Sequence, residues 1–224
     1  QEDCGVLLSV TGIIKVKGIV YGVGVNDADY KVGGCPFYNT WVEMLRRCLS
    51  VREKARHKTY REAISCEEWL TFSKFKAWME MQPWQGNDLD KDILVVGNKM
   101  YSPETCVFVP SYINTLLVKG DAIRGNWPLG VSLLKDQLSL GRKKVFRASI
   151  KDKRGASIQK NLGHFETSAE AHKAWQLAKY DVMSRRLDEY SSEECFNPAV
   201  ASAIKTRAIL LKLDAALGKE TIFI

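Results

Sequence analysis

The stretch from Leu89 to Asn114, LDKDILVVGNKMYSPETCVFVPSYIN, decides the predicted fold of the N-terminal half. A run that carries Asp90 and Asp92 predicts a short strand, and a glycine-bearing loop, a second strand and a helix start follow it. Because side chains two apart on a strand share a face, we expect both carboxylates to point the same way. This order predicts a ββα unit whose carboxylate and amide oxygens suit magnesium, manganese or calcium.

The residues on either side predict helical support for this unit. Helical spacing of Trp41, Met44 and Leu45 predicts one helix. A second helix is expected to start near Ser65, with acidic residues at 67 and 68 favouring its N-terminus. The opening residues 6–33 predict two or three short strands. Four cysteines could hold zinc, but without a CxxC pair buried thiols are the expected reading: Cys35, Cys48, Cys66 and Cys106.

At these motifs the sequence resembles the HNH endonucleases of the ββα-metal superfamily, in particular a phage-encoded group with the words LDKD, GNK and YSPETC and a late Asn. The words YGVGVND, WVEMLRRC and CEEWLTFSKFKAWMEMQPW are similar to the same group, so the likeness covers most of residues 21–117. The resemblance implies a nuclease with one bound Mg²⁺ or Mn²⁺ and no small-molecule cofactor. It places the site at Asp90, Lys91, Asp92, Asn98 and Asn114.

The resemblance also implies a role for each of these residues. Asp90 and Asn114 are the expected metal ligands, and Asp92 is the base or a second ligand. Asn98 would orient the loop or the phosphate, and Lys91 would neutralise phosphate charge. HNH enzymes commonly use a His on the first strand as general base, whereas this sequence has no His between residues 57 and 164. His57 is held as a substitute base, and His164 and His172 are read as surface or packing residues.

A second domain is predicted after a polar, glycine-bearing linker at residues 120–127. Three strand-like runs, PLGVSLLKDQ, KKVFRASIKD and SIQKNLGHF, precede a helix that Thr167 or Ser168 caps and that runs to about Arg186. A small-residue face on this helix, including Ala169 and His172, is expected to lie on the sheet. This order, with its GV, RASI, LG and EA words, resembles the plant Apetala/ethylene-response-factor DNA-binding domain over residues 128–186.

Basic residues are concentrated in this second part. Residues 118–160 hold eleven Lys or Arg and three Asp, an excess larger than the net charge of +7 of the whole chain. Cations facing phosphates release counterions, which favours DNA as the partner. The expected DNA-binding residues are Arg124, Lys135, Arg142, Lys143, Lys144, Arg147, Lys151, Lys153, Arg154 and Lys160.

The remaining features bound the location and the C-terminal end. No run of eighteen apolar residues is present, which predicts no membrane partner. The start QEDCGVLLSV is acidic where a signal peptide is basic, and six scattered Cys favour reduced thiols. With the phage likeness, this predicts the cytoplasm of the bacterial host cell. A helix from Ala199 to Leu217, stopped by Gly218, is expected at the end.

The predicted class is therefore α+β: an HNH-like ββα-metal nuclease domain at 1–119, the linker at 120–127, a three-stranded antiparallel sheet with a helix at 128–190, and a helical extension at 191–224. The predicted function is a metal-dependent, site-specific DNA endonuclease or nickase of the phage homing type. One ββα unit per chain predicts a monomer. Because the His base is absent, a catalytically inactive, sequence-specific DNA-binding protein stays open as the alternative.

Overall fold

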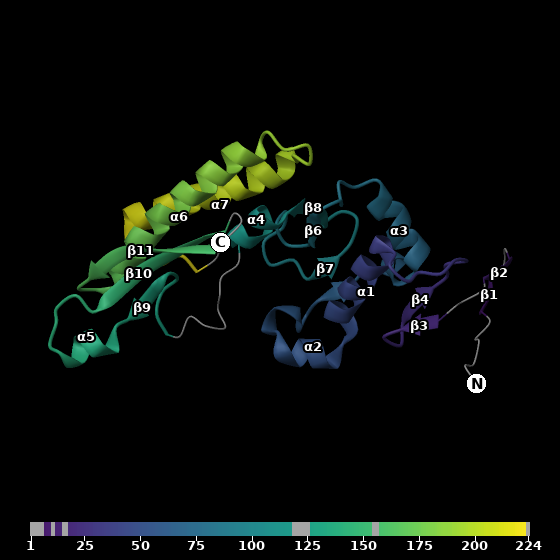
Figure 1. Cartoon of the computed structure of the whole chain (residues 1–224), viewed down its shortest axis with the longest axis horizontal. Coiled ribbons are helices and arrows are strands. Elements are labelled where there is room, and N and C mark those ends of the chain that lie inside the picture. Colours follow the sequence, from purple (N-terminus) through teal and green to yellow (C-terminus); the bar gives the residue numbers. More distant parts are fainter. Residues whose placement is uncertain (1–6, 10–11, 15–17, 118–125, 154–156, 223–224) are drawn as a thin grey trace. The chain divides into compact units, whose positions relative to one another are not determined.

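The chain forms an α+β fold in which seven α-helices and several small sheets lie within the described residues (Figure 1). It divides into two compact units, Gln1–Val109 and Pro110–Ile224. The division precedes the predicted linker, most of which lies outside the described part. Among the helices described, none has the length and apolarity to cross a membrane. This computed structural model describes residues 7–9, 12–14, 18–117, 126–153 and 157–222.

The first unit is built from short strand pairs around three helices. The helices are α1 (Pro36–Leu49), α2 (Val51–Arg56) and α3 (Phe72–Glu80), with 3-10 turns η1 (Lys58–Tyr60) and η2 (Glu68–Leu70). The strand pairs are β1 (Leu7–Ser9) with β2 (Gly12–Ile14), β3 (Gly18–Val20) with β4 (Gly24–Asn26), β5 (Ile64–Ser65) with β7 (Met100–Tyr101), and β6 (Asn87–Asp90) with β8 (Val107–Pro110). The opening thus holds four three-residue strands where two or three were predicted.

The core of the first unit is aromatic. The predicted stripe of α1 is confirmed, because Trp41, Met44 and Leu45 are fully buried. The Trp41 indole N–H donates to the carbonyl of Trp69 at 2.7 Å, which satisfies the one polar atom of this large buried side chain. Phe72 of α3 packs 5.5 Å from the Trp41 ring. These contacts fix α3 against α1.

The predicted start of the second helix near Ser65 is wrong. Residues 68–70 form the 3-10 turn η2, and the α-helix begins at Phe72. In its first turn, Ser73 bonds to a residue outside the helix. Ser73 donates its backbone N–H to Asp27 Oδ1 at 2.9 Å and its hydroxyl to Asp27 Oδ2 at 2.5 Å. A carboxylate that follows β4 therefore supplies the negative charge that the helix N-terminus favours.

The second unit contains the three-stranded antiparallel sheet that the sequence predicted. Its order is β11 (Ser157–Phe165), β10 (Phe146–Lys153) and β9 (Val131–Leu133). A short helix α5 (Lys135–Ser139) replaces the end of the first predicted strand. The long helices α6 (Ser168–Tyr190) and α7 (Pro198–Leu217) follow, and α4 (Ser111–Asn114) with the 3-10 turn η3 (Thr115–Leu117) opens the unit.

Helix α6 covers one face of the sheet at close range (Figure 1). It begins at the predicted cap Thr167, which forms a capping box with Glu170, and ends at Tyr190, one turn later than expected. The predicted small-residue face is confirmed at His172 and Trp175, which are buried, and is wrong at Ala169, which is exposed, whereas Ala171 is buried against the sheet. Gly130, at φ +76°, has no room for a side chain, because a Cβ there would lie 1.9 Å from the Trp175 ring.

Helix α7 packs along α6 and matches its prediction closely. Ile204, Ala208 and Leu211 are buried, and Gly218 ends the helix in the left-handed conformation at φ 64°. The chain then returns to α6, where the backbone N–H of Thr221 donates to His172 Nε2 at 3.0 Å. His172 therefore carries its proton on Nδ1, which donates to the carbonyl of Leu129 at 2.9 Å. This confirms His172 as a packing residue.

Burial of Lys179 between α6 and the sheet generates a stability prediction. Its side chain is 7% exposed, and burial lowers the pKa of its ammonium to about 8, with Asp152 opposing the shift. Since the folded pKa lies below the ordinary 10.5, the folded state disfavours the charge, and wild-type stability rises as pH increases from about 8 to 10.5. Lys179→Met should therefore stabilise the protein at pH 7 by on the order of 1 kcal/mol, and the gain should shrink by pH 10.

Urea unfolding at pH 7 and pH 10 measures this difference. Lys173→Met is the matched control, because Lys173 lies on the same helix and is exposed. Its effect should stay within about 0.5 kcal/mol at both pH values. A loss of stability in Lys179→Met at pH 7 would show that the buried charge is compensated.

Candidate functional site

The acidic turn that ends β6 is the first candidate site. Asp90 is the last residue of β6, and Asp92 lies beyond it in a bend, so the prediction that both sit on one strand is wrong. Asp90 Oδ1 instead accepts the backbone N–H groups of Asp92 at 2.9 Å and of Ile93 at 2.7 Å. A short polar side chain that bonds the backbone two residues ahead closes an Asx-turn. Both bonds use Oδ1, and Oδ2 is the oxygen that remains available to a cation.

The electrostatics of this turn favour a positive partner. Burial, followed by the nearby carboxylate of Asp92, raises the pKa of Asp90 to about 6. The two backbone hydrogen bonds and Lys91 oppose that rise. Two acidic groups held close in a half-buried turn repel each other, and a bound cation relieves the repulsion. Asp90 and Asp92 are therefore suited to hold a hard divalent ion.

The loop after Asp90 is held by Lys91 and Asn98. Lys91 is buried, and its ammonium contacts Asp92 Oδ2 at 3.1 Å and the Asn98 carbonyl at 3.0 Å. Asn98 Nδ2 donates to the carbonyls of Lys91 at 2.6 Å and Met100 at 2.7 Å, and its Oδ1 accepts the Met100 N–H at 3.2 Å. Asn98 thus orients the loop, one of its two expected roles. The Lys91 charge is directed inward to Asp92.

The other predicted members lie apart along the chain. Asn114 is the last residue of α4 and belongs to the second unit, whereas Asp90 belongs to the first, so this ligand pair stays a prediction. His57 caps the end of α2, with Nε2 3.7 Å from a Glu53 oxygen and its ring beside Tyr60. Within the described ranges, no cluster of three or more His, Cys, Asp or Glu side chains has metal-binding geometry.

The four cysteines considered for zinc differ in burial. Cys48 and Cys106 are buried, and burial raises their thiol pKa values to about 11 and about 12. Cys35 and Cys66 are only half-buried. The expectation of buried thiols is therefore confirmed for Cys48 and Cys106 alone.

The uncovered face of the sheet is the second candidate site. Directly paired residues of antiparallel strands share a face, and Arg147 pairs with Ser132 and with His164. Beyond a register shift, Ser149 pairs with Asn161 and Lys151 with Gln159. The face opposite α6, called the open sheet face below, therefore carries only polar side chains among the residues described: Ser132, Arg147, Ser149, Lys151, Gln159, Asn161 and His164.

The open sheet face has no carboxylate among the described side chains. The one acidic residue of β10, Asp152, pairs with Ile158 and lies on the opposite side. There its Oδ1 accepts from Arg186 Nη2 at 2.6 Å, and its Oδ2 contacts Arg185. Side chains on the open face bond weakly to each other, with Arg147 Nε 3.3 Å from Ser132 Oγ and Gln159 Nε2 3.2 Å from Ser149 Oγ. The face offers positive charge and several hydrogen-bonding groups to a ligand.

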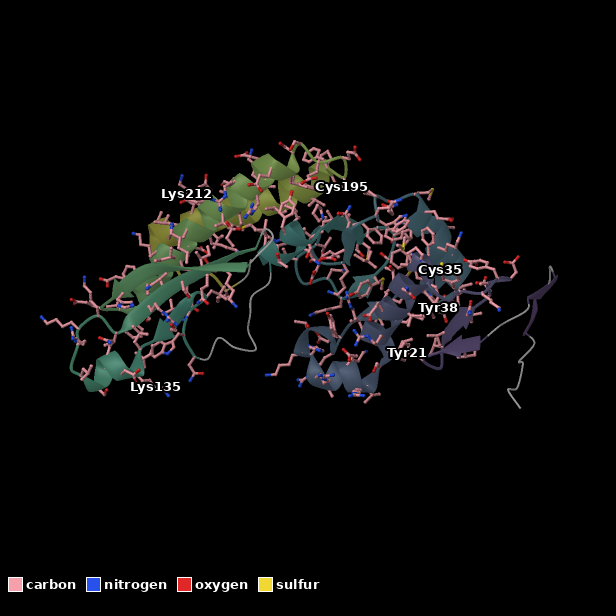
Figure 2. The ribbon with its side chains drawn as sticks, viewed as in Figure 1. Tyr21, Cys35, Tyr38, Lys135, Cys195 and Lys212 are labelled. Atoms are coloured by element: carbon pink, nitrogen blue, oxygen red, sulfur yellow. The ribbon has the colours of Figure 1, made fainter. Side chains whose placement is uncertain are left out.

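The remaining basic residues are distributed around this face. Lys135 stands at the start of α5 (Figure 2), and Arg142, Lys143 and Lys144 are exposed in the loop before β10. Lys160 pairs with buried Ile150 and so belongs to the side of α6. Arg124 and Arg154 lie outside the described residues, and so does the side chain of Lys153.

Comparisons with known proteins leave both sites without a precedent. No family model, no curated protein and no solved structure matches the chain. The chemistry of the two sites therefore has to be inferred from their own residues.

Sequence reasoning identified the cations of the open sheet face but missed its uncharged members. Ser149, Gln159 and Asn161 lie between or opposite the cations because strands alternate their side chains. The sequence itself contains this alternation, because Arg147, Ser149 and Lys151 occupy every second position. A prediction based on charge alone therefore leaves out the uncharged members of the open sheet face.

The hydrogen bonds of Asn98 generate a prediction about the acidic loop. Asn98→Ala removes three hydrogen bonds and takes the side-chain donor from the Lys91 carbonyl, whereas the Met100 carbonyl keeps the Thr105 hydroxyl at 2.9 Å, so we expect a loss of stability of on the order of 1–3 kcal/mol. Urea unfolding measures the loss. Lys99→Ala is the control, because it removes only an exposed ion pair with Glu62 that contributes at most about 1 kcal/mol. Equal effects of the two substitutions would contradict the role of Asn98 in holding the loop.

Proposed function

We propose that this protein is a metal-dependent DNA endonuclease or nickase of the HNH type, in which the second unit binds double-stranded DNA and the first hydrolyses a phosphodiester bond. The observation that carries the proposal is the open sheet face, which is polar and cationic. None of its described side chains is a carboxylate. A ligand that complements it is a polyanion with hydrogen-bonding edges. Duplex DNA has both properties.

The composition of the open sheet face suits base recognition in the major groove. That groove admits a two-stranded β-ribbon, and β10 and β11 form such a ribbon of eight paired positions. Arg147 and Lys151 carry the groups that bond guanine O6 and N7, while Gln159 and Asn161 carry amides that bond adenine N6 and N7. Cations around the face would neutralise phosphates and contribute the affinity that does not depend on sequence.

The acidic turn supports the hydrolytic half of the proposal. The half-buried Asp90 carboxylate keeps Oδ2 available, and Asp92 adds a second negative group beside it. A divalent ion bound there would supply positive charge to the phosphorus and to the leaving oxygen of the scissile bond. The Asn98 hydrogen bonds hold the loop in place, and the Lys91 ion pair orients Asp92. Asp92 is exposed, and its carboxylate would accept the proton from water.

A second candidate function is sequence-specific DNA binding without cleavage. It is favoured by the Asp90 turn, in which Oδ1 already accepts two backbone N–H groups and so has a structural role. It is also favoured by the inward ion pair of Lys91, which already balances one of the two acidic charges. In this case the first unit would be a scaffold, and the protein would act as a regulator or inhibitor.

Substitution of Asp90 separates these two functions. Asp90→Ala should abolish nicking of plasmid DNA in Mg²⁺ or Mn²⁺ and leave DNA affinity nearly unchanged, because the cations that bind DNA lie on other residues. Asp90→Asn keeps the size and the Oδ1 acceptor and removes only the charge, so it should lose nicking as well. EDTA should have the same effect on the wild type.

Nicking and gel-shift assays on the same preparations measure both quantities. If Asp90→Ala nicks as fast as the wild type, the proposed metal site is wrong. If the wild type binds DNA and nicks no substrate with either metal, the binding-only function replaces the nuclease.

Substitutions on the open sheet face test the DNA-binding half. After selection of a preferred sequence from random duplexes, Gln159→Ala with Asn161→Ala should reduce the preference by roughly 10-fold or more, because each good base contact contributes about 1–3 kcal/mol of discrimination. The salt dependence should stay the same, since no phosphate contact is lost. The control is Lys160→Gln, on the opposite side of the sheet, which should keep the sequence preference. Unchanged preference in the double variant would exclude this face from base recognition.

A further inference from the structure

A second basic surface belongs to the first unit. The segment Val51–Arg61 forms α2 and the turn η1 at the end of α1 (Figure 1). It contains five Lys or Arg and a single acidic residue. Four of its cations are exposed, and they are called the basic ridge below: Arg52, Arg56, Lys58 and Arg61.

The nearby carboxylates do not neutralise the basic ridge. Glu53 is buried, 7% exposed, and its carboxylate contacts Arg46 Nη1 at 2.7 Å and His57 Nε2 at 3.7 Å. Glu62 pairs with Lys99 at 3.5 Å. Across the described residues, no ion pair involves a member of the ridge. The acids of this region are thus committed to other cations, and the ridge presents positive charge to solvent.

The ridge carries an energetic cost within the fold. Arg52 and Arg56 are four residues apart on a helix of six residues, and like charges at this spacing destabilise a helix by about 0.2–0.5 kcal/mol. A repulsive arrangement of this kind is consistent with recognition of an external anion, which removes the repulsion when it binds.

The basic ridge is connected to the acidic turn through consecutive contacts. Lys54 of α2 donates to the carbonyl of Ala63 at 3.2 Å, just before β5. Strand β5 pairs in parallel with β7, whose Met100 carbonyl accepts from Asn98 at 2.7 Å. Asn98 in turn bonds Lys91, the neighbour of Asp90. One small strand pair therefore separates the ridge from the loop that holds the acidic turn.

We propose that the basic ridge is a phosphate-binding surface through which the first unit contacts the DNA backbone beside the acidic turn. This inference rests on the proposed function and adds a contact that is separate from the open sheet face. The ligand is the sugar–phosphate backbone, because the ridge consists of flexible point charges and guanidinium groups that bind phosphate without reading bases. The ridge contributes affinity to every sequence alike.

The test compares pairs of charge removals in the full-length protein. Arg56→Gln with Lys58→Gln removes two ridge cations, and Lys31→Gln with Lys74→Gln removes two exposed cations elsewhere in the first unit. Lys31 precedes α1 in the chain and Lys74 lies on α3, where the nearby Lys76 ammonium lies 5.4 Å from the ring of Phe37 at the N-terminal end of α1. A helix of 14 residues separates the two ends by about 20 Å.

The measurement is the affinity for a duplex oligonucleotide as a function of salt concentration. Each lost phosphate contact lowers the slope of log K against log salt by about 0.9 in magnitude, so the ridge pair should lower it by about 1.8. The control pair should leave the slope unchanged, and the sequence preference should be the same in all three proteins. Thermal unfolding verifies that each variant is folded.

The outcomes separate the two proposals. If the wild type binds DNA and the ridge pair has the same slope as the control pair, the ridge inference is wrong and the proposed function stands. If the ridge pair loses sequence preference instead of slope, the ridge is not a backbone contact. If the wild type binds no duplex DNA even at low salt, the proposed function fails and the ridge proposal fails with it.

Discussion

The close contact between α6 and the sheet is the constraint on which the second unit depends. Trp175 reaches the backbone of Gly130, and small residues such as Ala148 and Ala171 keep the helix near the strands. The helix therefore occupies one face of the sheet completely. An antiparallel sheet covered on one side leaves its other face to solvent, so every second residue of β10 is free to serve a ligand rather than the core.

In the first unit, the main constraint is the energetic cost of burying the charged group of Asp90. Asp90 is half-buried with another carboxylate beside it, and it is tolerated because two backbone N–H groups and Lys91 compensate part of its charge. The negative potential that remains at the turn favours the binding of a cation. In the same unit, Asp27 shows the alternative, since its carboxylate is fully used to hold the start of α3.

The sequence predicted elements where one period persisted over many residues. The faces of α1 and α7 and the order of three strands before α6 follow from such patterns and were confirmed, as was the Thr167 cap of α6. The predictions were wrong where the hydrogen bonds of one side chain, rather than a repeated pattern, determine the local structure. The start of α3 depends on Asp27, which is 46 positions from its partner Ser73, and no local signal at Ser65 could report it. Asp92 left its strand because the Asp90 side chain closes a turn, a choice that alternation does not encode.

The candidate site was predicted in part for the same reason. Asn98 was identified from its loop position, and its hydrogen bonds fulfil one of its expected roles. The uncharged members of the open sheet face were missed because their importance comes from pairing across strands, as between Lys151 and Gln159. A charged residue can be identified from the sequence alone. The residues that share one face of a sheet can be identified only when the register between its strands is known.

The register of β10 and β11 shifts between Ala148 and Ser149, opposite Gly163, whose φ of 125° only glycine adopts readily. A bulge of this kind bends the strand that carries the extra residue and increases the local right-handed twist. Increased twist at this point turns the two ends of the ribbon relative to each other, and Arg147 and Lys151 lie on either side of it. A flat ligand can touch such a ribbon at one end at a time, whereas a surface that is itself helical can follow it along its whole length.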